Sequence, residues 1–200
     1  RDLRARYAGA RRTEISEEEM EIEDEALIPE GRMLVTLSHS GYIKRVSPDI
    51  YRAQGRGGKG ITGADTKDGD FIERLILADN KDFLLIFTTW GWVHWLKVYK
   101  IPELGRNSLG RFIENLIPLR EAEGDDGRGK ERIASIIPVS AFAPDHFLCT
   151  VSRGGYIKKT SLQDYSRPKR GGIIGAGLKE DDILVRAVLT NGDTNLMVST

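Results

Sequence analysis

One short pattern occurs three times in this chain and restricts its fold more than any other feature. Residues 34–45 read LVTLSHSGYIKR, residues 84–95 read LLIFTTWGWVHW, and residues 148–159 read LCTVSRGGYIKK. Each copy has an apolar run, a turn that contains glycine, and a second run led by an aromatic residue, which is typical of a β-hairpin. Regular repeats of this kind predict a domain built from copies of one unit.

Each hairpin is followed by a short turn, a loop with glycine and basic residues, and a further apolar run, at 71–78, 133–139 and 183–189. Four strands in roughly 50 residues is typical of a propeller-type blade. We therefore predict an all-β, propeller-like array of four-stranded blades, here a fragment with about three complete repeats. The expected blades are residues 31–80, 81–144 (with a surface insertion at 121–130), 145–193, and the start of a fourth at 194–200.

The first 30 residues differ from the repeats in charge. Residues 1–12 are compatible with the end of a helix, whereas residues 13–30 contain nine carboxylates and no basic residue, which predicts an extended linker. The negative charge of this segment offsets a positive charge on the rest of the chain. The net charge of the whole chain is zero, but residues 31–200 contain 25 basic and 20 acidic side chains. We expect two units, an upstream helix end with an acidic linker (1–30) and the repeat domain (31–200).

A glycine-rich basic loop follows each hairpin, and we call these the first-repeat loop (54–60, QGRGGKG), the second-repeat loop (105–111, GRNSLGR) and the third-repeat loop (168–172, PKRGG). Glycine lets backbone N–H groups approach a phosphate closely, and arginine or lysine adds charge-assisted hydrogen bonds. A nucleotide P-loop is excluded because Ala53 and Gly60 stand where that motif needs glycine and serine or threonine. A flexible glycine turn with incidental charge is the alternative.

In a radial array these loops would form a basic stripe along one rim, which is typical of sequence-neutral DNA binding. For the basic residues at the strand ends, an ordinary solvated strand face is the alternative. The predicted DNA-binding residues are Gln54, Gly55, Arg56, Gly57, Gly58, Lys59 and Gly60 in the first-repeat loop, and Lys44, Arg45, Arg52, Arg106, Arg111, Lys158, Lys159, Lys169 and Arg170 elsewhere.

Other reactive side chains favour structural roles. Ser38-His39-Ser40 occupies a hairpin turn, and no acidic residue is placed by the sequence to orient the imidazole. The three histidines lack metal-ligand spacing, and Cys149 lies within an apolar strand. Of Trp90, Trp92 and Trp95, we expect two to pack in the core. The sequence thus predicts neither a catalytic residue nor a metal site.

The hairpin repeats and the first-repeat loop resemble those of a known family. Residues 36–45 and 51–61 are similar to the first blade of the C-terminal domain of the DNA gyrase A subunit, and the first-repeat loop matches that family's GyrA box. The box usually has a basic second residue, whereas this chain has Gly55, so we expect one DNA contact of the family to be missing while Arg56 and Lys59 remain. The resemblance continues through 95–111 to the last repeat, and residues 7–15 resemble the segment that leaves the family's breakage and reunion domain.

The resemblance implies a six-bladed β-pinwheel whose blades exchange strands, with double-stranded DNA wrapped on its basic rim to support ATP-dependent negative supercoiling by the whole enzyme. It implies the gyrase B subunit and the rest of the A subunit as partners in an A2B2 holoenzyme. The active-site tyrosine then lies upstream and the ATP and magnesium site on the B subunit, so no cofactor is expected here. We expect a cytoplasmic, nucleoid-associated chain, with no membrane partner. The alternatives are the DNA-guiding domain of the topoisomerase IV A subunit and a propeller-like protein scaffold.

Overall fold

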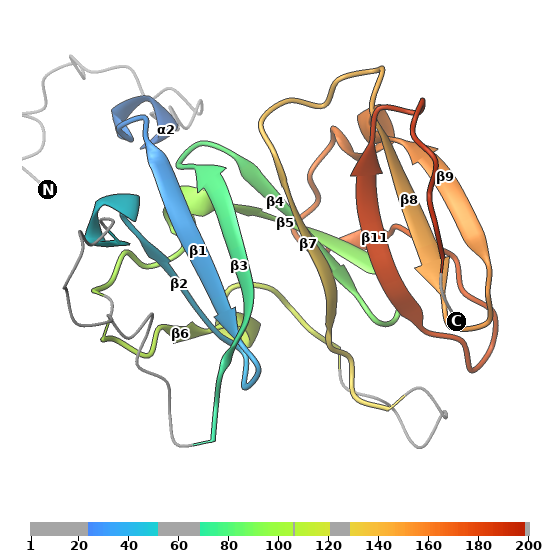
Figure 1. Ribbon diagram of the computed structural model, residues 1–200, viewed down its shortest axis with the longest axis horizontal. Helices are drawn as coiled ribbons and strands as arrows, with labels where there is room; N and C mark the ends of the chain where they lie inside the picture. Colours follow the sequence, from blue (N-terminus) through green and yellow to red (C-terminus); the bar gives the residue numbers. More distant parts are fainter. Residues whose placement is uncertain (1–23, 52–68, 106, 121–128, 199–200) are drawn as a thin grey trace, which may run out of the picture.

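The computed structural model describes residues 24–51, 69–105, 107–120 and 129–198. Strands dominate, as predicted, and they form three antiparallel sheets that stand side by side in Figure 1. The strand orders are β3-β1-β2-β6, β10-β5-β4-β7 and β11-β8-β9. The strands are β1 (Arg32–Ser38), β2 (Tyr42–Val46), β3 (Ile72–Asp79), β4 (Phe83–Thr88), β5 (Trp92–Lys97), β6 (Arg111–Phe112), β7 (Ile133–Val139), β8 (Phe147–Ser152), β9 (Ile157–Ser161), β10 (Ile173–Ile174) and β11 (Leu184–Thr190).

Helical structure in the described residues is limited to short pieces. Part of the predicted acidic linker forms one turn of α-helix, and single 3-10 turns follow the hairpins. The predicted helix end at residues 1–12 lies outside the described residues. The short helices are α2 (Asp24–Leu27), η1 (Pro48–Tyr51), η2 (Val98–Lys100), η3 (Ile113–Asn115) and η4 (Leu162–Tyr165).

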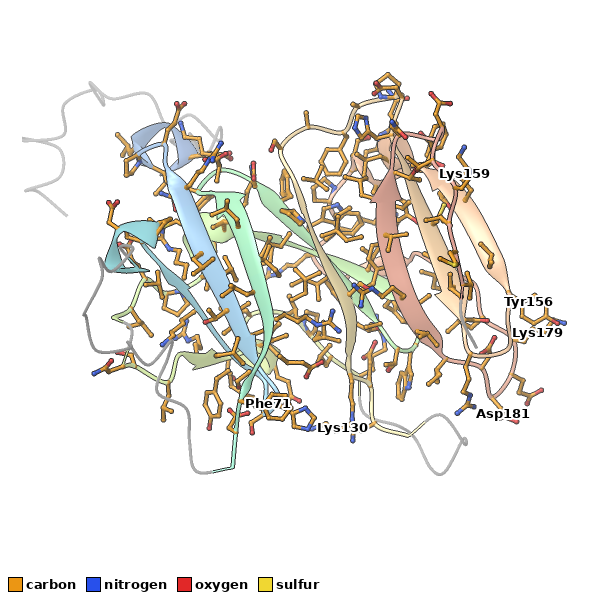
Figure 2. All side chains as sticks on the ribbon, viewed as in Figure 1. Phe71, Lys130, Tyr156, Lys159, Lys179 and Asp181 are labelled. Carbon is orange, nitrogen blue, oxygen red and sulfur yellow. The ribbon has the colours of Figure 1, made fainter. Side chains whose placement is uncertain are left out.

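The three hairpin turns share one conformation. Gly41, Gly91 and Gly155 have φ angles of +91°, +79° and +81°, which glycine adopts without steric cost. Two residues of each turn are joined by the same hydrogen bond, from the glycine N–H to the carbonyl of the last residue of the first strand. These turns lie at one end of the sheets. Figure 2 labels Phe71 next to the first turn and Tyr156 at the third. The repeat seen in the sequence is thus a repeat of backbone geometry.

An acidic residue two positions before the last strand of each repeat (β3, β7 or β11) supports the hairpin turn of that repeat. Asp70 accepts the Ser40 N–H (2.9 Å), and Asp182 accepts the Gly154 N–H (2.8 Å). In the middle repeat Glu131, 1% exposed, accepts the Thr88 hydroxyl at 2.5 Å. Burial raises the pKa of Asp70, but hydrogen bonds, foremost that with the Ser38 side chain, outweigh burial and keep this pKa below its usual range. At Asp182 the hydrogen bond with the Ser152 side chain lowers the pKa most, and burial opposes the shift. The supporting hydrogen bonds connect parts of each repeat that are far apart in sequence.

The sheets exchange their outermost strands. β6 follows the second hairpin in sequence but pairs with β2 of the first sheet, where Ile43 opposes Arg111. β10 follows the third hairpin but pairs with β5 of the second sheet, where Val93 opposes Ile173. Each later repeat therefore completes the sheet of the repeat before it, which is the exchange that the resemblance implied. Residues 196–198, expected to begin another strand, lie outside the strands of the structure.

The core lies between neighbouring sheets, and β4 shows how. Its side chains alternate: Leu84 and Ile86 join the cluster shared with the first sheet, and Leu85 and Phe87 join the cluster shared with the third. All four are fully buried. A strand packed on both faces is continuously apolar, which explains the LLIF run in the middle repeat. The long strands β3, β7 and β11 face the middle of the array in Figure 1, so the exchanged strands lie on its outside.

Candidate nucleic-acid interface

The second- and third-repeat loops occupy equivalent places on successive sheets. Each leads directly into an exchanged strand, so it reaches the outer edge of the preceding sheet. Two glycines allow this close approach: Gly110 has a φ of +101° and Gly172 a φ of +75°. A Cβ atom would lie 2.7 Å from the Ile43 carbonyl oxygen at Gly110, and 2.8 Å from the Val93 carbonyl oxygen at Gly172. Glycine is required at both points because backbone meets backbone.

Two of the predicted DNA-binding residues are engaged within the protein. Lys44 is only 2% exposed, and its ammonium group donates to the carbonyl oxygens of Ser108 (2.6 Å) and Gly105 (3.4 Å). Arg45 is also engaged within the protein: its Nε donates to the Ile101 carbonyl at 2.8 Å, and Nη2 lies 3.3 Å from a Glu103 carboxylate oxygen. Neither side chain lies on a solvated strand face, because the following repeat covers them.

Other predicted residues are exposed on the outer edges of the sheets. Arg111 begins β6, the outermost strand of the first sheet, and Lys169 and Arg170 immediately precede β10 at the edge of the second. On the third sheet the outer strand is β9 itself, and its Lys158 and Lys159 are exposed. Lys159, labelled in Figure 2 on the outer side of that sheet, has its ammonium 4.1 Å from the centre of the Phe147 ring. Each described sheet thus carries basic side chains at its outer edge.

The remaining predictions fall outside the described residues. They are Arg52, the whole first-repeat loop (Gln54, Gly55, Arg56, Gly57, Gly58, Lys59 and Gly60), and Arg106 of the second-repeat loop. Their role in DNA binding stays a prediction.

Sequence reasoning missed the residues that support the third-repeat loop. Arg120 donates from Nη2 to the carbonyl oxygen of Gly171 (3.3 Å), and its guanidinium carbon lies 3.2 Å from the centre of the Trp92 ring. A Cβ atom on Gly172 would lie 2.7 Å from the ring of His94, so this ring packs directly under the loop. A lone arginine in the segment after η3 carries no sequence signal, since its partners come from two different repeats.

His39 and Ser38 of the first hairpin turn make contacts that stabilise the fold. His39 has an acidic neighbour after all: its Nδ1 lies 3.2 Å from a Glu73 carboxylate oxygen, and its ring stacks on Phe71. Ser38, however, is 4% exposed and its hydroxyl accepts the Tyr42 N–H at 3.1 Å, as a turn-stabilising residue does. Across the described residues, no group of three or more histidine, cysteine, aspartate or glutamate side chains could hold a metal ion.

The tryptophans and the cysteine also belong to the packing. Trp90 is buried, whereas Trp92 and Trp95 are half-buried. The indole of Trp95 donates to the carbonyl oxygen of Tyr165 at 2.8 Å. Cys149 is buried in β8, as predicted.

His94 gives the fold a measurable pH dependence. Its ring is 2% exposed and neither nitrogen has a hydrogen-bond partner; burial, aided by the nearby Arg120 charge, lowers its pKa from 6.5 to about 4. Because the unfolded chain binds the proton near pH 6.5, stability that is full above this pH is lost as the pH falls toward 4. Between pH 7 and 5 we expect a loss of about 1 to 2 kcal/mol in unfolding free energy.

Urea unfolding of the wild type and His94→Leu at several pH values measures this effect. The difference between the two free energies should change in favour of the variant as the pH falls from 7 to 5. A constant difference would show that His94 takes up a proton equally well in both states.

Comparison with known proteins places this geometry in context. A family model described as the DNA gyrase C-terminal domain, beta-propeller, matches residues 32–79, 82–113 and 146–191. The A subunit of DNA gyrase from Neisseria gonorrhoeae is 42% identical over 98% of this chain and 21% of that protein. The A subunit of DNA gyrase from Haemophilus influenzae is 39% identical over 98% of this chain and 22% of that protein. The chain therefore spans about a fifth of the length of these curated relatives.

Solved structures share the same fold. The C-terminal domain of DNA topoisomerase IV is 30% identical, with a TM-score of 0.64 over 82% of this chain and 47% of that one. A DNA gyrase A C-terminal domain is 26% identical, with a TM-score of 0.59 over 80% of this chain and 48% of that one. Among the described residues, no helix is both long and apolar enough to span a membrane.

Proposed function

Because the chain belongs to the family of DNA gyrase C-terminal β-propeller domains, we propose that it binds double-stranded DNA without sequence preference along the outer edges of its sheets. The observation that carries this proposal is the recurrence of one arrangement. Exposed basic residues stand at the outer edge of each described sheet, and glycines let two of the loops dock there. Contacts to phosphates from repeated units fit a duplex, whose backbone charge is itself regularly spaced.

We further propose that the duplex is wrapped and not merely bound. Bending 20 to 30 base pairs by 40 to 90° costs on the order of 1 to 6 kcal/mol, so a wrap needs several loops acting together. The sheets stand side by side in Figure 1, which supports this assignment, since their successive outer edges would contact the DNA one after another. The first-repeat loop, with its match to the GyrA box, is the proposed anchor at one end.

The longer proteins that this chain resembles suggest its setting. We propose that it works within the A subunit of an ATP-dependent type II topoisomerase, together with the B subunit, in the cytoplasm. The wrapped segment would be presented for strand passage, which takes place elsewhere in the enzyme, and ATP and magnesium would be used there as well. In this proposal no residue of the chain itself is catalytic.

The fold likeness to topoisomerase IV keeps a second candidate, a domain that guides DNA without wrapping it. Ligation of nicked circular DNA distinguishes the two. Circles closed in the presence of the natural-length protein, then deproteinised, should show a shift in linking number of one sign, because a wrap traps writhe. Circles closed with Arg56→Ala/Lys59→Ala protein should show a smaller shift. Duplex binding with no linking-number shift would contradict wrapping and favour the guiding role.

A further inference from the structure

Lys44 lies beneath the second-repeat loop, in a place where an ammonium group is costly. A charged group removed from water loses several kcal/mol of solvation unless acceptors surround it, and an apolar side chain of the same length would avoid this cost. The acceptors here are loop carbonyls, those of Ser108 at 2.6 Å and Gly105 at 3.4 Å. The buried charge is thus directed at the loop backbone.

The loop is also fixed at its far end. Gly110 approaches the Ile43 carbonyl so closely that a Cβ atom would lie 2.7 Å from it, and Arg111 then pairs with Ile43 across the sheet. Ile113 continues this docking by donating its N–H to the Gly41 carbonyl at 2.9 Å. Lys44 therefore holds the middle of a loop whose end is already attached to β2, and the side chain of Arg111 stays exposed.

The second sheet repeats this arrangement with a different residue. His94 is the third residue after the turn glycine Gly91, as Lys44 is after Gly41, and its ring lies under the third-repeat loop beside Gly172. Lys158 is the third residue after Gly155, and it is exposed. In the described part of the chain, β9 has no strand on its outer edge. In the first two sheets, the third position after the turn glycine is therefore where the sheet supports the loop of the next repeat.

We propose that Lys44 is a positioning residue for DNA binding, whose ammonium group turns loop carbonyls inward so that the second-repeat loop presents Arg111 to a phosphate. Carbonyl oxygens carry partial negative charge and would repel a phosphate if they faced the duplex. With the oxygens of Gly105 and Ser108 held by Lys44, the outward surface of the loop becomes more favourable for an anion. This inference rests on the proposed function.

A double-mutant cycle on the natural-length protein tests the inference. The dissociation constant for a mixed-sequence duplex is measured over a range of salt concentrations for the wild type, Lys44→Met, Arg111→Gln and the double variant. Lys44→Met keeps the side-chain length but loses the donors, so binding should weaken about tenfold and the log–log salt slope should become shallower by about 1. Arg111→Gln should cost much less in the Lys44→Met background than in the wild type.

Each outcome separates positioning from simple stabilisation. Thermal melting without DNA identifies the temperature range in which every variant is folded, and binding is compared within that range. If Lys44→Met does not fold, Lys44→Gln, which keeps a shorter N–H donor, replaces it with smaller changes in the same direction. Unchanged affinity and slope, or additive effects with Arg111→Gln, would overturn the role of Lys44 but leave the proposed function standing. A wild-type protein without salt-dependent duplex affinity would instead overturn the proposed function.

Discussion

Replacing Gly91 by alanine is expected to lower the free energy of unfolding by about 3 to 4 kcal/mol. Gly91 has a φ of +79°, and a Cβ atom there would lie 2.2 Å from the carbonyl oxygen of Ala176. The backbone of the third repeat must then move away, which also breaks the hydrogen bonds that Gly91 O accepts from the Gly175 and Ala176 N–H groups (2.8 and 2.9 Å). Denaturant unfolding of the variant measures the loss.

The equivalent glycine of the third hairpin provides a matched control. Gly155 has nearly the same φ, +81°, but no described atom lies within 4 Å of a Cβ atom placed there. Gly155→Ala should therefore cost only the backbone strain, about 1 kcal/mol. Equal losses at Gly91 and Gly155 would show that the close approach of the third repeat to the second hairpin contributes nothing to stability.

The hairpins and the turn glycines were predictable because their signals are local. A turn at Gly41, Gly91 or Gly155 needs a residue that tolerates a positive φ, and the flanking apolar runs are visible within a few positions. The later strands β3, β7 and β11 were predicted from the same pattern. The sequence therefore indicated the unit of the fold and its repetition.

Contacts between repeats were not visible in the sequence. Lys44 has the appearance of a surface residue beside Arg45, and only the carbonyls of residues more than 60 positions later make its burial favourable. The same holds for Glu73, which meets His39 across 34 positions, and for Arg120 under the third-repeat loop. Single-residue patterns carry no information on such partners, so the residues that support the loops were missed while those that carry charge were found.

Duplex affinity should depend steeply on salt. Apart from Lys44 and Arg45, which are engaged within the protein, the predicted interface has nine basic residues. Of these, Arg111, Lys158, Lys159, Lys169 and Arg170 are described and exposed. If roughly 6 of the nine contact phosphates, the slope of log K against log salt concentration is about −5. Affinity should then fall about a thousandfold between 50 and 200 mM salt, because the release of counterions from the DNA gains less free energy as the salt concentration rises.

Charge removed from a loop should matter more than charge removed elsewhere. Lys169→Gln/Arg170→Gln removes two charges at the edge of the second sheet, and should make the slope shallower by about 1.8. Lys81→Gln/Lys100→Gln removes the same charge from residues outside the three loops, where Lys81 pairs with Glu30 at 3.6 Å. This control should keep a nearly unchanged slope. Equal changes in both variants would mean that net charge, and not the loops, attracts the DNA.

The salt dependence of duplex binding by the wild type and these two double variants therefore tests the proposed interface most directly. We predict a steep wild-type slope, a clear loss of slope when Lys169 and Arg170 are neutralised, and little change in the control. A shallow wild-type slope, or weak duplex affinity even at low salt, would contradict the claim that the outer edges of the sheets bind DNA.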